Sequence, residues 1–422
     1  MTTSSVQTCK RCLYNTNHPL GLVLDADGIC SGCRVHEEKD SLDWAERWQR
    51  LEQLVKPYRS RDSRNYDCIV PVSGAGDSFF IVHLVKERLG LKPLLVTYNR
   101  YYNTPLGIRN LAQLRRRFDC DILIQSVNPL SVKKIIRSTL RELGSFHWPV
   151  LAGQSVFPVQ TAVSHQVPLI IWGAHQGLEQ VGMFSHLHEV EMTRRYRKDH
   201  DLMGYEADDL LNIFDNLNET DIWQYRYPDE TSLEQLGVRG IYLGNYVRWD
   251  PLAQHHAMVA THGYQGARFA RSFDTYDHVD CWNFLDLHDI IKSYKHGYGK
   301  VTDHACREIR HCRLTREQGA ALVLHHSNQS AEHSDLFCDW IGINRRGLQF
   351  MLDQHRNPLY WKQPMPGQFE KIAECDEYLR EIVLSNTLEN KNVASEIGMQ
   401  SHRALYGSEG KNYITIGKGY PD

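Results

Sequence analysis

The sequence predicts an α/β protein built around a parallel sheet, with a small metal-binding module before the sheet and a mostly helical region after it. Three observations support this class. Short apolar runs alternate with helix-like segments between residues 65 and 260, four cysteines lie within the first 33 residues, and strand-like runs fade after residue 260. Continuous apolar strands that alternate with helices form parallel sheets that are covered on both faces.

The N-terminal cysteines follow the pattern C-x2-C-x17-C-x2-C, formed by Cys9, Cys12, Cys30 and Cys33. Two such pairs supply the four thiolates of a tetrahedral zinc site. Because four thiolates leave no open coordination position, we expect structural zinc in a ribbon that occupies, with one helix, residues 1–58. Four ordinary thiols, or a redox or iron–sulfur site, are the alternatives. The helix is expected over 41–56, with Ser41 as its N-terminal cap, because tryptophans and aliphatic residues recur there at helical spacing.

The central domain is expected to span 65–260. Its predicted strands are 67–72, 93–98, 121–127 and 168–172, and its predicted helices are 79–89, 105–118, 129–143 and a stretch near 155–165. Ligands of such sheets bind beyond the carboxyl ends of the strands. A helical lobe is expected over 261–385, with helices at 285–294, 315–324 and 370–384, and a polar tail over 386–422.

The loop SGAGDS at residues 73–78 follows the first predicted strand and opens the next helix. Backbone N–H groups at a helix N-terminus form an anion site. The hydroxyls of Ser73 and Ser78 add donors, and Asp77 is suited to hold Mg²⁺ bound to phosphates. The loop therefore predicts phosphate binding, although an ordinary tight turn has a similar composition.

This loop resembles the S-G-G-x-D-S loop of the PP-loop ATP pyrophosphatases, which cleave ATP to AMP and pyrophosphate. Together with the four cysteines, the segments IIWGAHQGLE, HEVEMTRRYRKDHDLMGYEADDL and YKHGYGKVTDHACREIRHCRLTREQ resemble the N-acetyl sugar amidotransferase family of bacterial lipopolysaccharide and surface-glycan biosynthesis. The resemblance covers residues 5–380. It departs at Ala75, which stands where the pattern has its second glycine. If that position needs a positive φ, alanine would cost about 1–2 kcal/mol and reduce ATP turnover.

The resemblance implies an ATP-dependent amidotransferase that converts the N-acetyl group of a nucleotide sugar into an acetamidino group. Adenylation of the amide oxygen would make a leaving group, and ammonia would then displace AMP. A partner glutaminase, similar to that of imidazole glycerol phosphate synthase in histidine biosynthesis, would supply the ammonia. The implied cofactors are ATP, Mg²⁺ and structural Zn²⁺.

The resemblance and the strand ends together give candidate roles to individual residues. ATP and pyrophosphate would be bound by Ser73, Gly74, Ala75, Gly76, Asp77, Ser78, Thr97, Tyr98, Asn99, Gly173 and Lys300. The catalytic candidates are Asp77, Ser78, His175 and Glu179. On a helix, His175 and Glu179 would share a face, either to orient the substrate or ammonia or as a surface pair.

The sugar nucleotide would be held by a second set of residues. The candidates are Arg194, Arg195 and Arg197, with Tyr298, Thr302 and Asp303. Arginine forks match phosphate geometry. The basic run is also compatible with a solvated face, and Thr302 and Asp303 with a helix cap.

Composition restricts the other classes of function. The net charge is −3, which argues against a large nucleic-acid-binding face. The chain shows no apolar run of about 18 residues and no secretory signal, so we expect a cytoplasmic protein without a membrane span. Its eleven cysteines would then stay reduced. Two alternatives remain open, a PP-loop enzyme that thiolates tRNA and a catalytically weakened zinc scaffold for a glutaminase. The sugar, and whether it carries UDP or CMP, stays undetermined.

Overall fold

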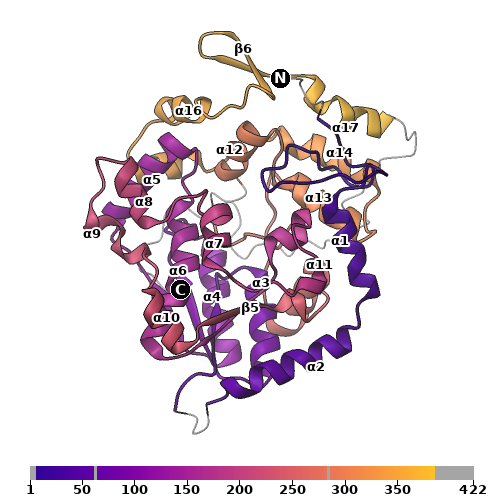
Figure 1. Cartoon of the computed structure of the whole chain (residues 1–422). Coiled ribbons are helices and arrows are strands. Elements are labelled where there is room, and N and C mark those ends of the chain that lie inside the picture. Colours follow the sequence, from indigo (N-terminus) through magenta and orange to yellow (C-terminus); the bar gives the residue numbers. More distant parts are fainter. Residues whose placement is uncertain (1–5, 61–63, 283–285, 385–422) are drawn as a thin grey trace.

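The computed structural model describes residues 6–60, 64–282 and 286–384 (Figure 1). The tail expected over 386–422 and the first residue of the helix expected at 285–294 lie outside these ranges. The expected domain boundaries remain predictions. In the described part of the chain, no helix is long and apolar enough to cross a membrane.

The centre of the molecule is a sheet of five parallel strands in the order β3-β2-β1-β4-β5. The strands are β1 Cys68–Pro71, β2 Pro93–Tyr98, β3 Ile122–Gln125, β4 Leu169–Trp172 and β5 Arg239–Tyr242. The predicted α/β class and the first four strands are confirmed. Strand β5 was not predicted, because a four-residue strand that contains arginine and glycine lacks an apolar run.

Helices cover both faces of the sheet. They are α3 Gly76–Val82, which continues as the π-helix η2 His83–Arg88, then α4 Pro105–Phe118 and α6 Trp148–His165, whereas α5 Pro129–Leu143 packs against α6. Side chains of α3, α4 and α11 (Pro251–His262) pack on one face of the sheet, and those of α6 pack on the other. The chain order reverses between β1 and β4, and such a switch point opens a crevice at the carboxyl ends of the strands.

Short helical segments fill the connection from β4 to β5 and the turn after β5. They are η3 Gly177–Val181, η4 His186–His188, α7 Arg194–Tyr196, η5 Arg197–Asp201, α8 Ala207–Ile213, α9 Glu219–Ile222, η6 Trp223–Tyr225, α10 Glu230–Leu236 and η7 Leu243–Asn245. Part of this long connection, at η5, lies beside the crevice.

The C-terminal region is mostly helical, as predicted. Its elements are α12 Leu287–His296, α13 Lys300–Arg310, α14 Arg316–Ser327, α15 Ser334–Ile341, α16 Arg345–Asp353, the hairpin β6 Trp361–Met365 with β7 Gln368–Lys371, and α17 Glu374–Leu384. The hairpin was not predicted, and it occupies the start of the helix expected at 370–384.

The N-terminal region contains two helices where one was expected. Helix α1 spans Ser31–Ser41, α2 spans Trp44–Val55, and a short turn η1 follows at Lys56–Tyr58. The cap predicted at Ser41 is wrong, because Asp43 accepts the N–H bonds of Ala45 and Glu46 that begin α2. The cysteine segment packs into one core with α13, α14 and α17, so the two ends of the described chain lie together (Figure 1).

Candidate functional site

The four N-terminal cysteines form a closed cluster. The sulfurs of Cys9, Cys12, Cys30 and Cys33 all lie within 4.8 Å of one another, and all four residues are buried. The backbone N–H groups of Arg11, Cys12 and Cys30 donate to the Cys9 sulfur, at 3.4, 3.5 and 3.2 Å. Four convergent buried sulfurs with N–H donors fit a tetrahedral zinc thiolate site, and zinc bound there would cross-link the two cysteine pairs.

Arg310 of α13 packs against this cluster. Its guanidinium lies 3.4 Å from the sulfur of Cys33 and 3.6 Å from that of Cys30. It also donates to the carbonyls of Glu179 and Gln180, at 3.0 and 2.8 Å. A buried arginine therefore joins the cysteine cluster, the C-terminal region and the segment after β4. No sequence pattern indicates this contact, because Arg310 lies 277 residues beyond Cys33.

A pocket of ≈ 260 Å³ opens at the carboxyl ends of β1, β2 and β4. The predicted site residues that line it are Ser73, Asp77, Ser78, Thr97, Tyr98, Gly173 and Arg197. The pocket is also lined by residues that were not among the predicted site residues, including Arg100, Gln154 and Trp172. The sheet thus brings together residues from the loop, the second strand, the fourth strand and η5, whereas Asn99 is not part of the lining.

The loop backbone explains how Ala75 is accommodated. Gly74 has a φ of +88°, and a Cβ there would lie 2.8 Å from the carbonyl oxygen of Gly107. Ala75 itself is extended, with φ −81° and ψ 166°. The positive φ therefore falls one residue earlier than the possibility considered from the sequence, and the strain suggested for Ala75 does not arise.

Hydrogen bonds inside the loop hold its shape. The Ser78 hydroxyl accepts from the Ser73 N–H at 3.0 Å, and the Ser73 hydroxyl accepts from the Ala75 N–H at 3.2 Å. Gly76 is closely covered, because a Cβ at this position would overlap the imidazole of His255 on α11. The two hydroxyls thus stabilise the loop in the absence of any ligand, and α11 fixes the start of α3.

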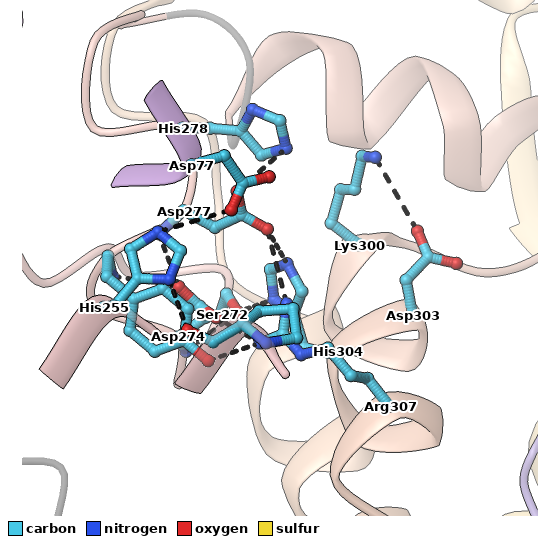
Figure 2. A network of polar contacts seen from close by, with 12 residues as sticks. Asp77, His255, Ser272, Asp274, Asp277, His278, Lys300, Asp303, His304 and Arg307 are labelled. Carbon is cyan, nitrogen blue, oxygen red and sulfur yellow. Dashed lines mark hydrogen bonds and ion pairs between the residues drawn. The ribbon is translucent and has the colours of Figure 1, made fainter. Parts of the chain in front are cut away.

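Asp77 faces a polar network from the C-terminal region (Figure 2). Its Oδ1 is buried and has no hydrogen-bond partner in the described part of the chain, and Nε2 of the His255 ring lies 3.8 Å away. Burial raises the pKa of Asp77 to about 6, and the carboxylate of Asp277 adds to the shift, although His255 opposes it. The loop carboxylate therefore meets a second carboxylate across the crevice.

Asp277 is surrounded by basic groups at distances longer than a good hydrogen bond. Arg307 lies 3.4 Å away, His304 3.6 Å and His278 3.6 Å. His304 is itself held by Ser272, whose hydroxyl lies 2.6 Å from Nδ1. Burial opposes ionisation, but His278, His304 and Arg307 together hold the pKa of Asp277 well below its usual range. Asp277 is thus an oriented, ionised carboxylate.

The part of the chain that contains Asp277 is similar to a known protein family. Residues 268–374 match the family model described as LPS biosynthesis protein WbpG-like, C-terminal domain. We refer to these matched residues, 268–374, as the WbpG-like segment. The match agrees with the resemblance to a surface-glycan family, and the WbpG-like segment contains Asp277, which the sequence motifs had not connected with Asp77.

Two further comparisons add little. No curated protein matches the chain. Among solved structures, the NH3-dependent NAD synthetase from Campylobacter jejuni, in complex with nitrate, is 12% identical over 46% of this chain and 92% of that chain, with a TM-score of 0.28. The α/β fold assignment rests on the five-stranded parallel sheet itself.

His175 and Glu179, expected to share a face, have different partners. The ring of His175 packs between Tyr196 and Tyr242, with centroids 4.3 and 4.8 Å away, and burial lowers its pKa to about 4. Glu179 accepts a 2.6 Å bond from the buried ammonium of Lys39 on α1. Glu179 thus holds the cysteine module, while His175 is a neutral core ring.

The basic run contributes one residue to the pocket. Arg197 pairs with Asp201 and stacks over Trp172 at 4.5 Å, at the pocket wall. Arg194 instead pairs with Glu206, and Arg195 is 92% exposed. Only the third arginine of the run is therefore placed to meet a ligand in the pocket.

The remaining predicted residues lie where the WbpG-like segment meets the cysteine module. Asp303 accepts a 2.8 Å bond from the Tyr14 hydroxyl, and the ring of Tyr298 lies 6.0 Å from that of Tyr14. Thr302 is buried on the same helix. Lys300 is buried, with its ammonium 3.8 Å from Asp303 (Figure 2). Of this group, Lys300 lies nearest the network around Asp277.

Proposed function

We propose that this chain is an ATP-dependent amidotransferase of lipopolysaccharide or surface-glycan biosynthesis. It would convert the N-acetyl group of a nucleotide sugar into an acetamidino group, with ammonia from a glutaminase. The observation that carries the proposal is the meeting of the SGAGDS loop with Asp277 of the WbpG-like segment. The loop is suited to bind ATP phosphates, and Asp277 belongs to a segment similar to a lipopolysaccharide biosynthesis protein.

The loop and pocket fit a nucleotide. A glycine with positive φ and the N-terminus of α3 provide the geometry of an anion site, and the pocket of ≈ 260 Å³ extends along Val96–Tyr98. The unsatisfied Oδ1 of Asp77 fits a ligand for Mg²⁺. Mg²⁺ bound there would neutralise phosphate charge during transfer of AMP.

In this proposal Asp277 would act on the acetamido group. Ser272 Oγ accepts from the N–H of Asp274 at 3.1 Å and lies 2.6 Å from Nδ1 of His304. Nε2 of the same ring lies 3.6 Å from Asp277. This chain of contacts orients the Asp277 carboxylate as a proton acceptor beside the loop.

The proposed reaction has two steps. The amide oxygen attacks the α-phosphorus of ATP and pyrophosphate leaves, while the amide N–H proton passes to Asp277 and its electrons form the C=N bond. Ammonia then adds to that carbon, and AMP leaves with the electron pair of the C–O bond. Arg197 and Arg100, both at the pocket wall, are suited to stabilise phosphate charge.

A direct assay tests this function. The purified chain, ATP, Mg²⁺, ammonium chloride and an acetamido nucleotide sugar should yield AMP and a product about one mass unit lighter, since O is replaced by NH. Asp77→Asn is the control for contaminating ATPases. Absence of AMP and of pyrophosphate exchange with every acetamido sugar nucleotide tested would contradict the proposal.

Both alternatives lose support from the geometry. A tRNA thiolation enzyme needs a reactive cysteine near ATP, and none of the described residues that line the pocket is a cysteine. The scaffold alternative was motivated by strain at Ala75, which is extended and unstrained. A copurifying tRNA would favour the first alternative over our proposal.

A further inference from the structure

A second cluster of metal-ligand side chains lies apart from both sites described above. His83 and Glu87 belong to η2, His262 is the last residue of α11, and their ligand atoms lie within 4.8 Å of one another. The side chains are 24%, 43% and 9% exposed, respectively. The cluster is thus anchored on one side and open to solvent on the other.

The three side chains converge on one carboxylate oxygen. Glu87 Oε2 lies 2.6 Å from Nδ1 of His83 and 3.1 Å from Nε2 of His262. His83 and Glu87 are four residues apart and so share one side of the helical segment. The ring of Phe118 stacks on His262 at 4.7 Å and fixes its plane. Two separate helical elements therefore present a prearranged set of ligands.

Hydrogen bonding around His262 determines which ring nitrogen faces the carboxylate as an acceptor. The hydroxyl of Thr261 donates to the carbonyl of Ala257 at 2.7 Å, so its oxygen accepts from Nδ1–H of His262 at 2.6 Å. A neutral His262 then directs the lone pair of Nε2 at Glu87. Two lone pairs face each other unless a cation lies between them. A donor bond on the far nitrogen is also the usual support of a metal-bound histidine.

Two basic side chains near the cluster donate to backbone carbonyls, and neither of these bonds involves Glu87. Arg117 donates to the backbone carbonyl of Thr261 at 2.9 Å, and Lys86 donates to that of Asp119 at 3.1 Å. Both cations are thus bound to backbone oxygens. The competing occupant is a proton that converts one imidazole to imidazolium, which the experiment below separates from a metal.

We propose that His83, Glu87 and His262 form a binding site for a divalent transition metal such as Zn²⁺ or Ni²⁺. Two imidazoles and one carboxylate are a ligand set that zinc uses in open sites, with water completing the coordination. Imidazole ligands disfavour Mg²⁺ and Ca²⁺. The site is independent of the proposed amidotransferase function.

The position of the site gives the metal a structural consequence. It would join η2, the continuation of the loop helix α3, to the C-terminal end of α11. The same helix α11 carries His255, which covers Gly76 of the phosphate loop. Metal at the distal end of this helix pair would therefore restrain the pair that supports the loop.

Calorimetric titration of the untagged full chain with Ni²⁺ tests the proposal, with zinc content measured before and after to exclude exchange at the cysteines. We expect one equivalent to bind to the wild type, and affinity to fall at least 30-fold in His83→Ala and in His262→Ala. His165→Ala, which removes an exposed histidine elsewhere, should bind as the wild type does. Thr261→Val should weaken binding several-fold while leaving all three ligands in place.

Two outcomes would overturn the site. One is wild-type protein that takes up no Ni²⁺ or Zn²⁺ beyond the cysteine cluster at millimolar metal, which would mean that a proton is the occupant. The other is a His262→Ala variant with unchanged affinity and stoichiometry. If binding is confirmed while no AMP forms in the assay above, the metal site stands and the proposed function falls.

Discussion

The cysteine cluster and the phosphate loop are both suited to bind an ion, yet their surroundings differ. The cluster is closed, since its four sulfurs are buried and receive hydrogen bonds from backbone N–H groups and from Arg310. The loop is open, because it borders a pocket and leaves Oδ1 of Asp77 unsatisfied within the described chain. A satisfied site serves the fold, whereas an unsatisfied polar atom beside a pocket indicates a ligand.

The largest expected effect is on the closed site. Cys30→Ser removes one of four thiolates, and we expect the protein to lose bound metal and about 3–5 kcal/mol of its free energy of unfolding. Metal analysis and denaturant unfolding measure both. Cys312→Ser, at an exposed cysteine, is the control. A Cys30→Ser protein of unchanged stability would show that the cluster does not support the fold.

At the phosphate loop, a substitution should reduce activity and leave the fold intact. Asp77→Asn is expected to reduce AMP formation about 10²–10³-fold while the fold is kept, because the carboxylate acts on the ligand rather than on the core. Steady-state assays and circular dichroism check the two parts. A variant that loses its fold along with its activity would remove the distinction between the two sites.

The pH dependence of stability tests whether Asp77 of the phosphate loop disfavours the fold when it is ionised. The folded pKa of Asp77, about 6, lies above its ordinary value of 3.8, so the ionised form is disfavoured in the folded protein. Its contribution to stability is complete below pH 3.8 and is lost as the pH rises through 6. Without nucleotide or Mg²⁺, Asp77→Asn should therefore be more stable than the wild type at pH 8 and equally stable at pH 4. Thermal unfolding at the two pH values tests this expectation.

Arg310→Met tests whether the cluster depends on its buried cation. The variant leaves thiolates and two carbonyls without their donor, and we expect a loss of about 3 kcal/mol with the metal still bound. Arg195→Met, at a side chain that is 92% exposed, should change stability by less than about 0.5 kcal/mol. Equal effects of the two substitutions would contradict the role of Arg310.

Asp277→Asn asks whether the WbpG-like segment completes the open site. We expect kcat to fall about 10–100-fold, since a proton acceptor is lost while the fold and the loop remain. Asp277→Glu should restore part of the rate, and Asp208→Asn, at an exposed aspartate, should have no effect. A rate within threefold of the wild type for Asp277→Asn would remove Asp277 from the mechanism.

The smallest effect is expected at Ala75. Because its backbone is extended, Ala75→Gly relieves no strain, and AMP formation should change less than threefold. An increase of tenfold or more would show that the methyl group crowds the bound phosphate.

Sequence patterns indicate local geometry best where the residues concerned lie close together in the chain. The cysteine pattern and residues 73–78 carry their geometry in their spacing, and the four apolar strands placed the loop at the end of β1. The strand pattern also placed Thr97, Tyr98 and Gly173 at the pocket, because residues after parallel strands share one edge.

Sequence patterns do not indicate contacts made only by tertiary packing. Asp277 belongs to none of the quoted motifs, and Arg310 lies in one that does not indicate its partner. Both meet their partners across some 200 or more residues. Conversely, His175 and Glu179 looked like a pair at helical spacing, but the turn directs one into an aromatic core and the other to Lys39. The spacing of His175 and Glu179 in the sequence therefore did not predict the contacts of either residue.

The docking of the cysteine module has a consequence for protein synthesis. Tyr14 meets Asp303, which the ribosome adds 289 residues later. At about 5–20 residues per second, the module waits roughly 15–60 s for its partner. During this interval its apolar side chains lack their final cover, so metal capture by the nascent chain would be the step that protects it from aggregation and proteolysis.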